Sequence, residues 1–263
     1  MEVLAAILGD LAAQAPDQIA VTGDLVNVAL PGEFVSARAF LERLGSPDRV
    51  SLVPGNHDAY VRAAFSYARD HWGDYMRGDR EAALDGSRSA TFPYLRRRGP
   101  LALIGVSTAI PTGPFMATGQ IGADQLTRLD RLLAQLAGEN ERPFRVIMLH
   151  HPPMLLPGDR LKRLIDAEPF RRLVVRHRAE LVLHGHSHVH SMHWLGEAGR
   201  EVPVAGVPSA SATERGEDRA AYNLFRVEQA EEGWRCEMLT RGFSDGHSGI
   251  TELHRRVLTP HVQ

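Results

Sequence analysis

The sequence predicts an α/β protein in which short buried strands alternate with amphipathic helices. Two strand-like segments, at residues 19–21 and 49–53, are each followed by a polar loop, and a helical pattern at 33–44 separates them. Further along, the apolar run 144–149 precedes a helical pattern at 167–177. Such alternation is typical of sheets covered by helices, where ligands gather beyond the carboxyl ends of the strands.

Length and composition fit one large domain, and we expect residues 1–263 to form it. Of the 263 residues, 43% are hydrophobic and 24% are charged, which is ordinary for a globular protein. The formal net charge of −2 and the pI of about 6.7 disfavour a general nucleic-acid binder. No apolar run reaches the roughly 18 residues of a membrane span, and the first residues do not read as a signal peptide.

Cysteine usage excludes two kinds of stabilisation. Cys236 is the only cysteine, so neither an intramolecular disulfide nor a cysteine zinc cluster can form. We expect Cys236 to be a small apolar residue of a late strand. A reducing, cytoplasmic location fits this usage.

The remaining elements follow from periodicity and from turn residues. Helical spacing predicts helices at 2–14, near 60–70 and at 123–137. Strand-like runs lie at 100–109 and 180–185. The tail alternates short strand-like segments, which lie at 192–195, 202–207, 221–228 and 234–243.

Polar clusters follow four of the predicted strands. The clusters are Thr22–Gly23–Asp24, Gly55–Asn56–His57–Asp58, His150–His151–Pro152–Pro153 and Gly185–His186–Ser187–His188. Together they supply carboxylate, amide oxygen and imidazole, a mixture that suits Mn²⁺, iron or Zn²⁺. Singly, a Gly-Asp pair after a strand is usually a turn, and a His-x-His in a loop is usually a surface feature. Their order and their common place at strand ends indicate a metal site.

On these residues the chain resembles the calcineurin-like metallophosphoesterase superfamily. The superfamily pattern reads D-x-H, then G-D, then G-N-H-[D/E], then H, then G-H-x-H, and the resemblance runs to about residue 215. Segments 150–153, 185–190 and 202–211 look nearest to the bacterial group that contains cyclic-nucleotide phosphodiesterases. The resemblance implies a calcineurin-like four-layer αββα sandwich of two mixed sheets flanked by helices, here lacking the first central strand.

The resemblance also assigns metal ligands residue by residue. Asp24 would bridge two divalent metal ions, of manganese, iron or zinc. Asn56, His150 and His186 would complete the second metal site, and His188 would belong to the first.

Catalytic roles are implied for the two residues that follow Asn56. His57 would contact the phosphate and protonate the leaving oxygen, and Asp58 would orient His57, because a carboxylate fixes an imidazole tautomer. A metal-bound hydroxide would attack phosphorus in line with the leaving group. His151, His190 and His193 match no ligand position, and we expect them to be structural.

The first element of the superfamily pattern, D-x-H, is absent. The aspartates before Asp24 are Asp10 and Asp17, and neither has a histidine two residues on. Asp10 lies in a helical pattern, so we expect it at a helix surface. Asp24 and His188 alone leave the first metal site incomplete. Two interpretations stay open: the protein begins some tens of residues upstream of Met1, or it begins there and is impaired or repurposed.

The leading functional hypothesis is a metal-dependent hydrolase of phosphate esters, most specifically a phosphodiesterase of the cyclic-nucleotide type. The alternative is a catalytically impaired metal-binding or interaction module, because D-x-H is missing, although retention of His57 argues against it. A nuclease is disfavoured, because Arg96–Arg98 is the only basic run and is expected to be a solvated turn. We expect a small phosphorylated substrate and no nucleic-acid or membrane partner, and a homodimer stays open.

Overall fold

The computed structural model describes residues 2–60, 62–79, 92–113, 116–154, 160–212, 218–231, 233–244 and 249–258. The chain divides into two compact units. The site unit is Gln18–His186, and the terminal unit combines Met1–Asp17 with Ser187–Gln263. The single domain expected over 1–263 stays a prediction. Within the described ranges, no helix is both long and apolar enough to cross a membrane.

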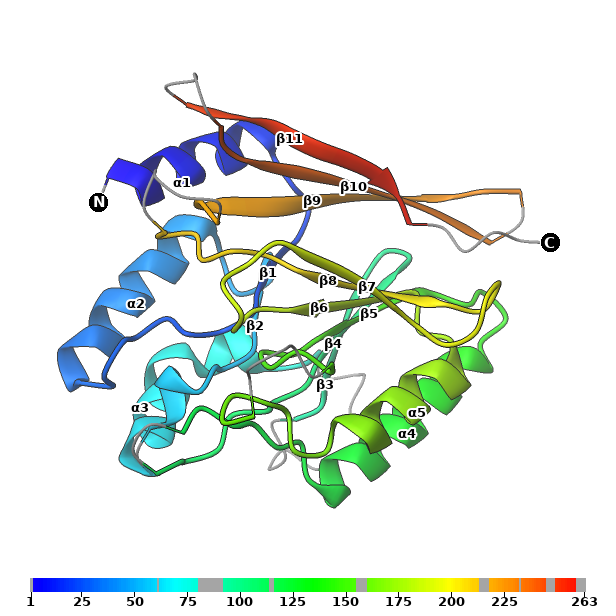
Figure 1. Ribbon diagram of the computed structural model, residues 1–263, viewed down its shortest axis with the longest axis horizontal. Helices are drawn as coiled ribbons and strands as arrows, with labels where there is room; N and C mark the ends of the chain where they lie inside the picture. The colour runs from blue at the N-terminus through cyan, green and yellow to red at the C-terminus, as the bar shows by residue number, and fades with distance from the viewer. Residues whose placement is uncertain are drawn as a thin grey trace. The chain divides into compact units, whose positions relative to one another are not determined.

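Parallel strands dominate the site unit (Figure 1). Its strands are β1 (Ile19–Val21), β2 (Val50–Leu52), β3 (Tyr94–Arg98), β4 (Leu101–Gly105), β5 (Phe144–Met148) and β6 (Leu181–His184). β1 pairs in parallel with β2, β4 pairs in parallel with β5, and β5 with β6, whereas β3 is antiparallel to β4. β5 and β6 are buried along their whole length, which explains why they read as continuous apolar runs.

Helices and short 3₁₀ turns connect these strands. They are α2 (Pro31–Leu44), η1 (His57–Ala59), α3 (Arg62–Trp72), η2 (Gly73–Met76), α4 (Ala123–Ala137) and α5 (Ala167–His177). α2 packs on α3, where the rings of Phe34 and Trp72 stack with centroids 5.0 Å apart. α4 packs on α5 and buries Leu129, Leu133 and Leu136, as the helical spacing predicts.

The Arg96–Arg98 run is not a solvated turn, so that prediction was wrong. These residues belong to β3, and Arg96 is only 2% exposed. Its guanidinium donates to the carbonyl oxygens of Val50 (2.7 Å), Asp74 (2.8 Å) and Arg77 (2.7 Å). Because backbone carbonyls satisfy the charge, the arginine can be buried, and it ties β3 to β2 and η2.

A second buried arginine joins β5 to the segment before β6. The Arg145 side chain is fully buried and binds Glu180 through two hydrogen bonds, from Nε to Oε2 (2.8 Å) and from Nη2 to Oε1 (2.7 Å). The Arg145 backbone N–H also donates to Glu180 Oε2 (2.8 Å). This bidentate pair fixes the start of the two strands that end near His150 and His186.

Antiparallel strands and one helix make up the terminal unit. Its elements are α1 (Glu2–Gln14), β7 (Ser191–Leu195), β8 (Val202–Gly206), β9 (Ala221–Gln229), β10 (Trp234–Phe243) and β11 (Ile250–Val257). β7 pairs with β8, and β10 lies between β9 and β11. Ile7 of α1 packs with Ala220 and Phe243. Cys236 lies on β10 and is buried, as expected, and burial raises the pKa of its thiol to about 12.

Asp10 is more than a helix-surface residue, which corrects the sequence prediction. Arg241 donates to both of its carboxylate oxygens at 2.7 Å, and the Tyr222 hydroxyl donates to Oδ2 at 2.5 Å. The hydrogen bond from Arg241 is the main reason that the pKa of Asp10 lies below its ordinary value. Asp10 therefore ties α1 to β9 and β10.

The mixed α/β fold that the sequence predicts is confirmed. Helices at 2–14, 123–137 and 167–177 begin and end where the periodicity places them. Two strands, β3 and β11, were not predicted.

Candidate metal centre

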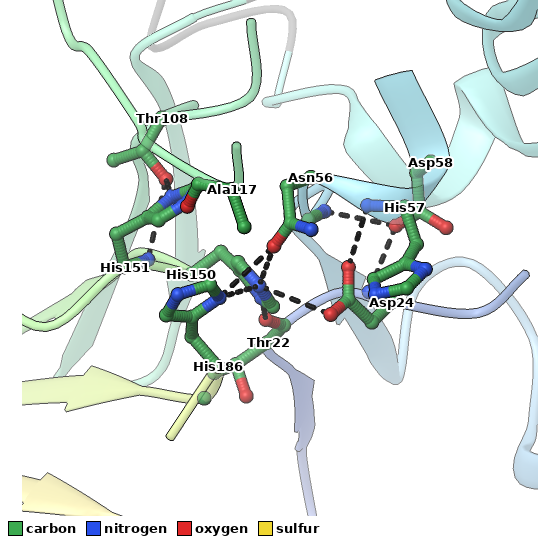
Figure 2. Close-up of polar contacts among 12 residues, drawn as sticks. Thr22, Asp24, Asn56, His57, Asp58, Thr108, Ala117, His150, His151 and His186 are labelled. Carbon is green, nitrogen blue, oxygen red and sulfur yellow. Dashed lines mark hydrogen bonds and ion pairs between the residues drawn. The ribbon is translucent and has the colours of Figure 1, made fainter. Parts of the chain in front are cut away.

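The predicted clusters lie at the carboxyl ends of strands in the site unit. Asp24 follows β1, Asn56 follows β2, His150 follows β5 and His186 follows β6. Figure 2 shows the side chains of these four residues pointing toward one another. Parallel strands bring their carboxyl ends to the same edge of a sheet, and this explains how residues so far apart in sequence meet.

Four donor atoms converge at this place (Figure 2). His150 Nε2 lies 3.1 Å from Asn56 Oδ1, 3.1 Å from His186 Nδ1 and 3.2 Å from Asp24 Oδ2. His186 Nδ1 lies 2.9 Å from Asn56 Oδ1. Two ligands bonded at right angles to one ion, each at about 2.1 Å, lie about 3.0 Å apart. The donor types and their spacing therefore fit a divalent metal ion of the kind that the sequence predicts.

These four residues are the ones predicted for the second metal site, and their binding of metal stays a proposal. His188, predicted for the first site, is an exposed residue of the terminal unit with a φ of +56°. Its role as a ligand stays a prediction.

The backbone around the candidate site is strained. Asp24 and His186 have φ angles of +58° and +66°, which residues other than glycine adopt at a cost of about 1–3 kcal/mol. Gly55 provides the room that Asp24 needs, because a Cβ at position 55 would lie 2.1 Å from Asp24 Oδ1. Strain of this kind clusters at functional sites.

Asp58 does not orient His57, which corrects the role implied by the resemblance. The carboxylate is fully buried and accepts four backbone N–H groups. The donors are Asp24 (2.9 Å) and Gly55 (2.8 Å) to Oδ2, and Leu25 (2.9 Å) and Val26 (3.2 Å) to Oδ1. Asp58 thus joins the loop after β1 to the loop after β2.

Burial raises the pKa of Asp58 to about 6, and the hydrogen bond from the Gly55 N–H, which lowers the pKa, offsets only part of this rise. For Asp24, burial would raise the pKa, but His150 and the backbone N–H of His57 outweigh it and hold the value at about 2. Burial lowers the pKa of His186 to about 3, and nearby His150 adds to this shift. An ionised Asp24 and a neutral His186 are the forms that coordinate metal.

The ring of His57 is held from one side by the backbone. Its Nδ1 lies 2.5 Å from the carbonyl oxygen of Asn27, and its own N–H donates to Asp24 Oδ1 (3.0 Å). The rings of His57 and Tyr60 form a T-shaped pair, with centroids 4.9 Å apart. A carbonyl oxygen can only accept a hydrogen bond, so Nδ1 carries the proton. Nε2 is then available to contact a substrate.

His151 is a structural neighbour of the site, although with His150 and His186 it forms a cluster close enough to hold a metal ion. The Thr108 hydroxyl lies 2.7 Å from its Nδ1, and its Nε2 lies 3.0 Å from the carbonyl oxygen of Ala117. Both ring nitrogens are therefore engaged. Its ring packs on that of His186, with centroids 4.4 Å apart, and so helps to orient that side chain. The structural role expected for His151 stays a prediction, and these two contacts are consistent with it.

Comparison with known proteins defines the class. The family model for calcineurin-like phosphoesterases matches residues 1–190, and the chain belongs to this family. The family implies divalent metal ions.

Two curated relatives are similar in sequence. The chain is 28% identical over 187 residues to a probable cyclic nucleotide phosphodiesterase of Synechococcus sp., which covers 70% of this chain and 62% of the relative. It is 27% identical over 176 residues to a glycerophosphodiester phosphodiesterase of Enterobacter lignolyticus, which covers 66% of this chain and 56% of that protein. The chain thus matches about six tenths of the length of these relatives.

A solved structure shares the fold. The crystal structure of a dimetal phosphatase from Danio rerio matches with a TM-score of 0.61 over 98% of this chain and 89% of that chain. The two sequences are 10% identical, so the likeness concerns the fold alone. It confirms the calcineurin-like fold class.

Proposed function

We propose that residues 1–263 act as one metal-dependent hydrolase of phosphate esters, and more specifically as a phosphodiesterase for a small substrate of the cyclic-nucleotide kind. The observation that carries the proposal is that donor atoms of Asn56, His150 and His186 lie 2.9–3.1 Å from one another, with Asp24 Oδ2 3.2 Å from His150 Nε2, in a chain of the calcineurin-like phosphoesterase family. Bound divalent ions would polarise the phosphate and activate a water molecule for attack.

The protein's own groups have distinct tasks in this proposal. Asp24, Asn56, His150 and His186 hold one ion, and His188 remains the proposed ligand of a second. His57 contacts the phosphate and protonates the leaving oxygen from Nε2, because Nδ1 is engaged by the backbone.

Support for a diester rests on the relatives, since both curated proteins are named phosphodiesterases. A small substrate fits the net charge of −2, which provides no general attraction for a nucleic-acid polymer.

The test combines metal content with hydrolysis of bis(p-nitrophenyl) phosphate in Mn²⁺. We expect His186→Ala to lose bound metal and activity together, and His57→Ala to keep its metal and lose roughly 10²–10⁴-fold in rate. His254→Ala is the matched control, because His254 is an exposed histidine of β11.

A folded wild-type protein that binds metal but hydrolyses neither this ester nor 3′,5′-cyclic AMP would overturn the proposal in favour of an impaired metal-binding module. Activity on a glycerophosphodiester with none on cyclic AMP would support the phosphodiesterase assignment and refute the cyclic-nucleotide assignment.

A further inference from the structure

The loop that follows Asp24 is gathered around one carboxylate. Glu33 Oε1 accepts the N–H of Asn27 (2.9 Å), and Oε2 accepts the N–H of Leu30 (2.7 Å). The N–H of Val28 lies between the two oxygens, at 3.4 and 3.3 Å. Three of the N–H groups of the loop at 27–30 therefore meet a single side chain.

Glu33 is itself held on a rigid element. It lies in the first turn of α2, where Pro31 at the start of the helix fixes the backbone. The next residue, Phe34, is fully buried and stacks on Trp72 of α3. Sequence reasoning missed Glu33, and the signal it left is a glutamate two positions after a helix-initiating proline.

The peptide group between Asn27 and Val28 links Glu33 to His57. A peptide group is planar, and its C=O and N–H point in opposite directions. In this group the N–H of Val28 faces Glu33, and the C=O of Asn27 faces Nδ1 of His57, at 2.5 Å. Fixing the N–H side of the plane therefore fixes the direction of the oxygen that meets His57.

The carboxylate oxygens of Asp58 do not hold the ring of His57, because they accept backbone N–H groups of the two loops. We propose that Glu33 is a positioning residue for His57: through the peptide group between Asn27 and Val28, it holds His57 in the tautomer with the proton on Nδ1. This inference rests on the proposed function in so far as it assigns the acid role to His57. In this tautomer Nε2 is the atom that takes up the proton destined for the leaving oxygen.

The tautomer can be measured without any reaction. We would label the histidines with ¹⁵N, load the protein with diamagnetic Zn²⁺ and record long-range ¹H–¹⁵N correlations, assigning His57 from its absence in His57→Ala. In the neutral ring of the wild-type protein we expect a protonated Nδ1 and an unprotonated Nε2. Glu33→Ala is expected to shift both nitrogens toward mixed tautomers, and Glu33→Gln, which keeps one acceptor oxygen, to lie between the two.

Glu42→Ala is the matched control, because Glu42 lies on the same helix and makes an exposed ion pair with Arg38. Its histidine spectrum is expected to match that of the wild-type protein. A wild-type His57 with the proton on Nε2, or an unchanged spectrum in Glu33→Ala, would overturn the inference.

A kinetic measurement separates positioning from general damage. An acid matters most for a poor leaving group. We therefore expect Glu33→Ala to lose about 10-fold or more in kcat on methyl phenyl phosphate, from which the more basic phenolate leaves, and less than about 3-fold on methyl p-nitrophenyl phosphate, from which p-nitrophenolate leaves. Equal losses for both leaving groups would count against the inference. If the wild-type protein hydrolyses neither ester, the proposed function fails, while the spectrum still decides whether Glu33 sets the tautomer.

Discussion

Replacing Gly55 by alanine tests the geometry of the candidate metal centre most directly. The new Cβ would lie 2.1 Å from Asp24 Oδ1 and 2.7 Å from Asp24 Cγ, whereas real Cβ atoms keep at least 3.0 Å from their neighbours. The difference between 3.0 and 2.1 Å means that the carboxylate, or the loop that carries it, must move by at least 0.9 Å. Misplacing a reacting group by about 1 Å costs about 10²-fold in rate. Disturbing the support of a ligand costs about 10–100-fold in metal affinity.

Two quantities are measured for Gly55→Ala: the affinity for Mn²⁺, by titration calorimetry, and the rate of hydrolysis of an aryl phosphodiester. Asp24→Asn, which keeps the shape of the ligand, serves as a second variant in case Gly55→Ala folds poorly. Gly73→Ala is the control, because its Cβ would meet only Arg69 Cγ, at 3.9 Å. Wild-type metal affinity and rate in folded Gly55→Ala would refute the placement of Asp24 against Gly55.

Two further predictions concern stability. Glu180→Ala removes the carboxylate partner of the fully buried Arg145. We expect the free energy of unfolding, measured with urea, to fall by about 3 kcal/mol. The control is Glu42→Ala, which breaks an exposed ion pair and is expected to cost less than about 0.5 kcal/mol. Because the folded pKa of Asp10 lies below its ordinary value of 3.8, the stability that its carboxylate adds is present above pH 3.8 and is lost as the pH falls through the folded value. The melting temperature of Asp10→Asn is therefore expected to lie below that of the wild-type protein at pH 7 and to converge with it in acid. A gap of constant size across this range would contradict the role of the Arg241 contact.

The placement of the candidate site could be predicted from sequence, because polar residues that directly follow buried parallel strands gather at the same edge of the sheet. The clusters that contain these residues were identified on that ground, and the family resemblance then selected Asp24, Asn56, His150 and His186 within them. The structure places Asn56, His150 and His186 against one another and Asp24 against His150. The direction of each side chain was harder to predict. Asp58 is next to His57 in sequence, but the 3₁₀ turn of η1 sends successive side chains about 120° apart, so the two residues face different partners.

The errors in the fold have physical reasons as well. The charge of Arg96 suggested exposure to solvent. Carbonyl groups of β2, of η2 and of the residue after η2 satisfy its guanidinium instead, and no local sequence pattern reveals such distant partners. β11 carries little apolar signal, and every one of its residues is exposed or partly exposed. It forms because β10 offers it a free edge, and this is a property of the assembled sheet rather than of residues 250–257.

The Asp58 carboxylate has a consequence for how the site unfolds. The Asp58 carboxylate, which η1 carries after β2, accepts three N–H groups of the loop after β1, so that loop cannot open without leaving a buried carboxylate short of partners. The free energy of opening then belongs to the pair of loops and not to either one. Release of Asp24 and exposure of Gly55 become a single cooperative event, and a ligand that stabilises one loop suppresses fluctuations in both.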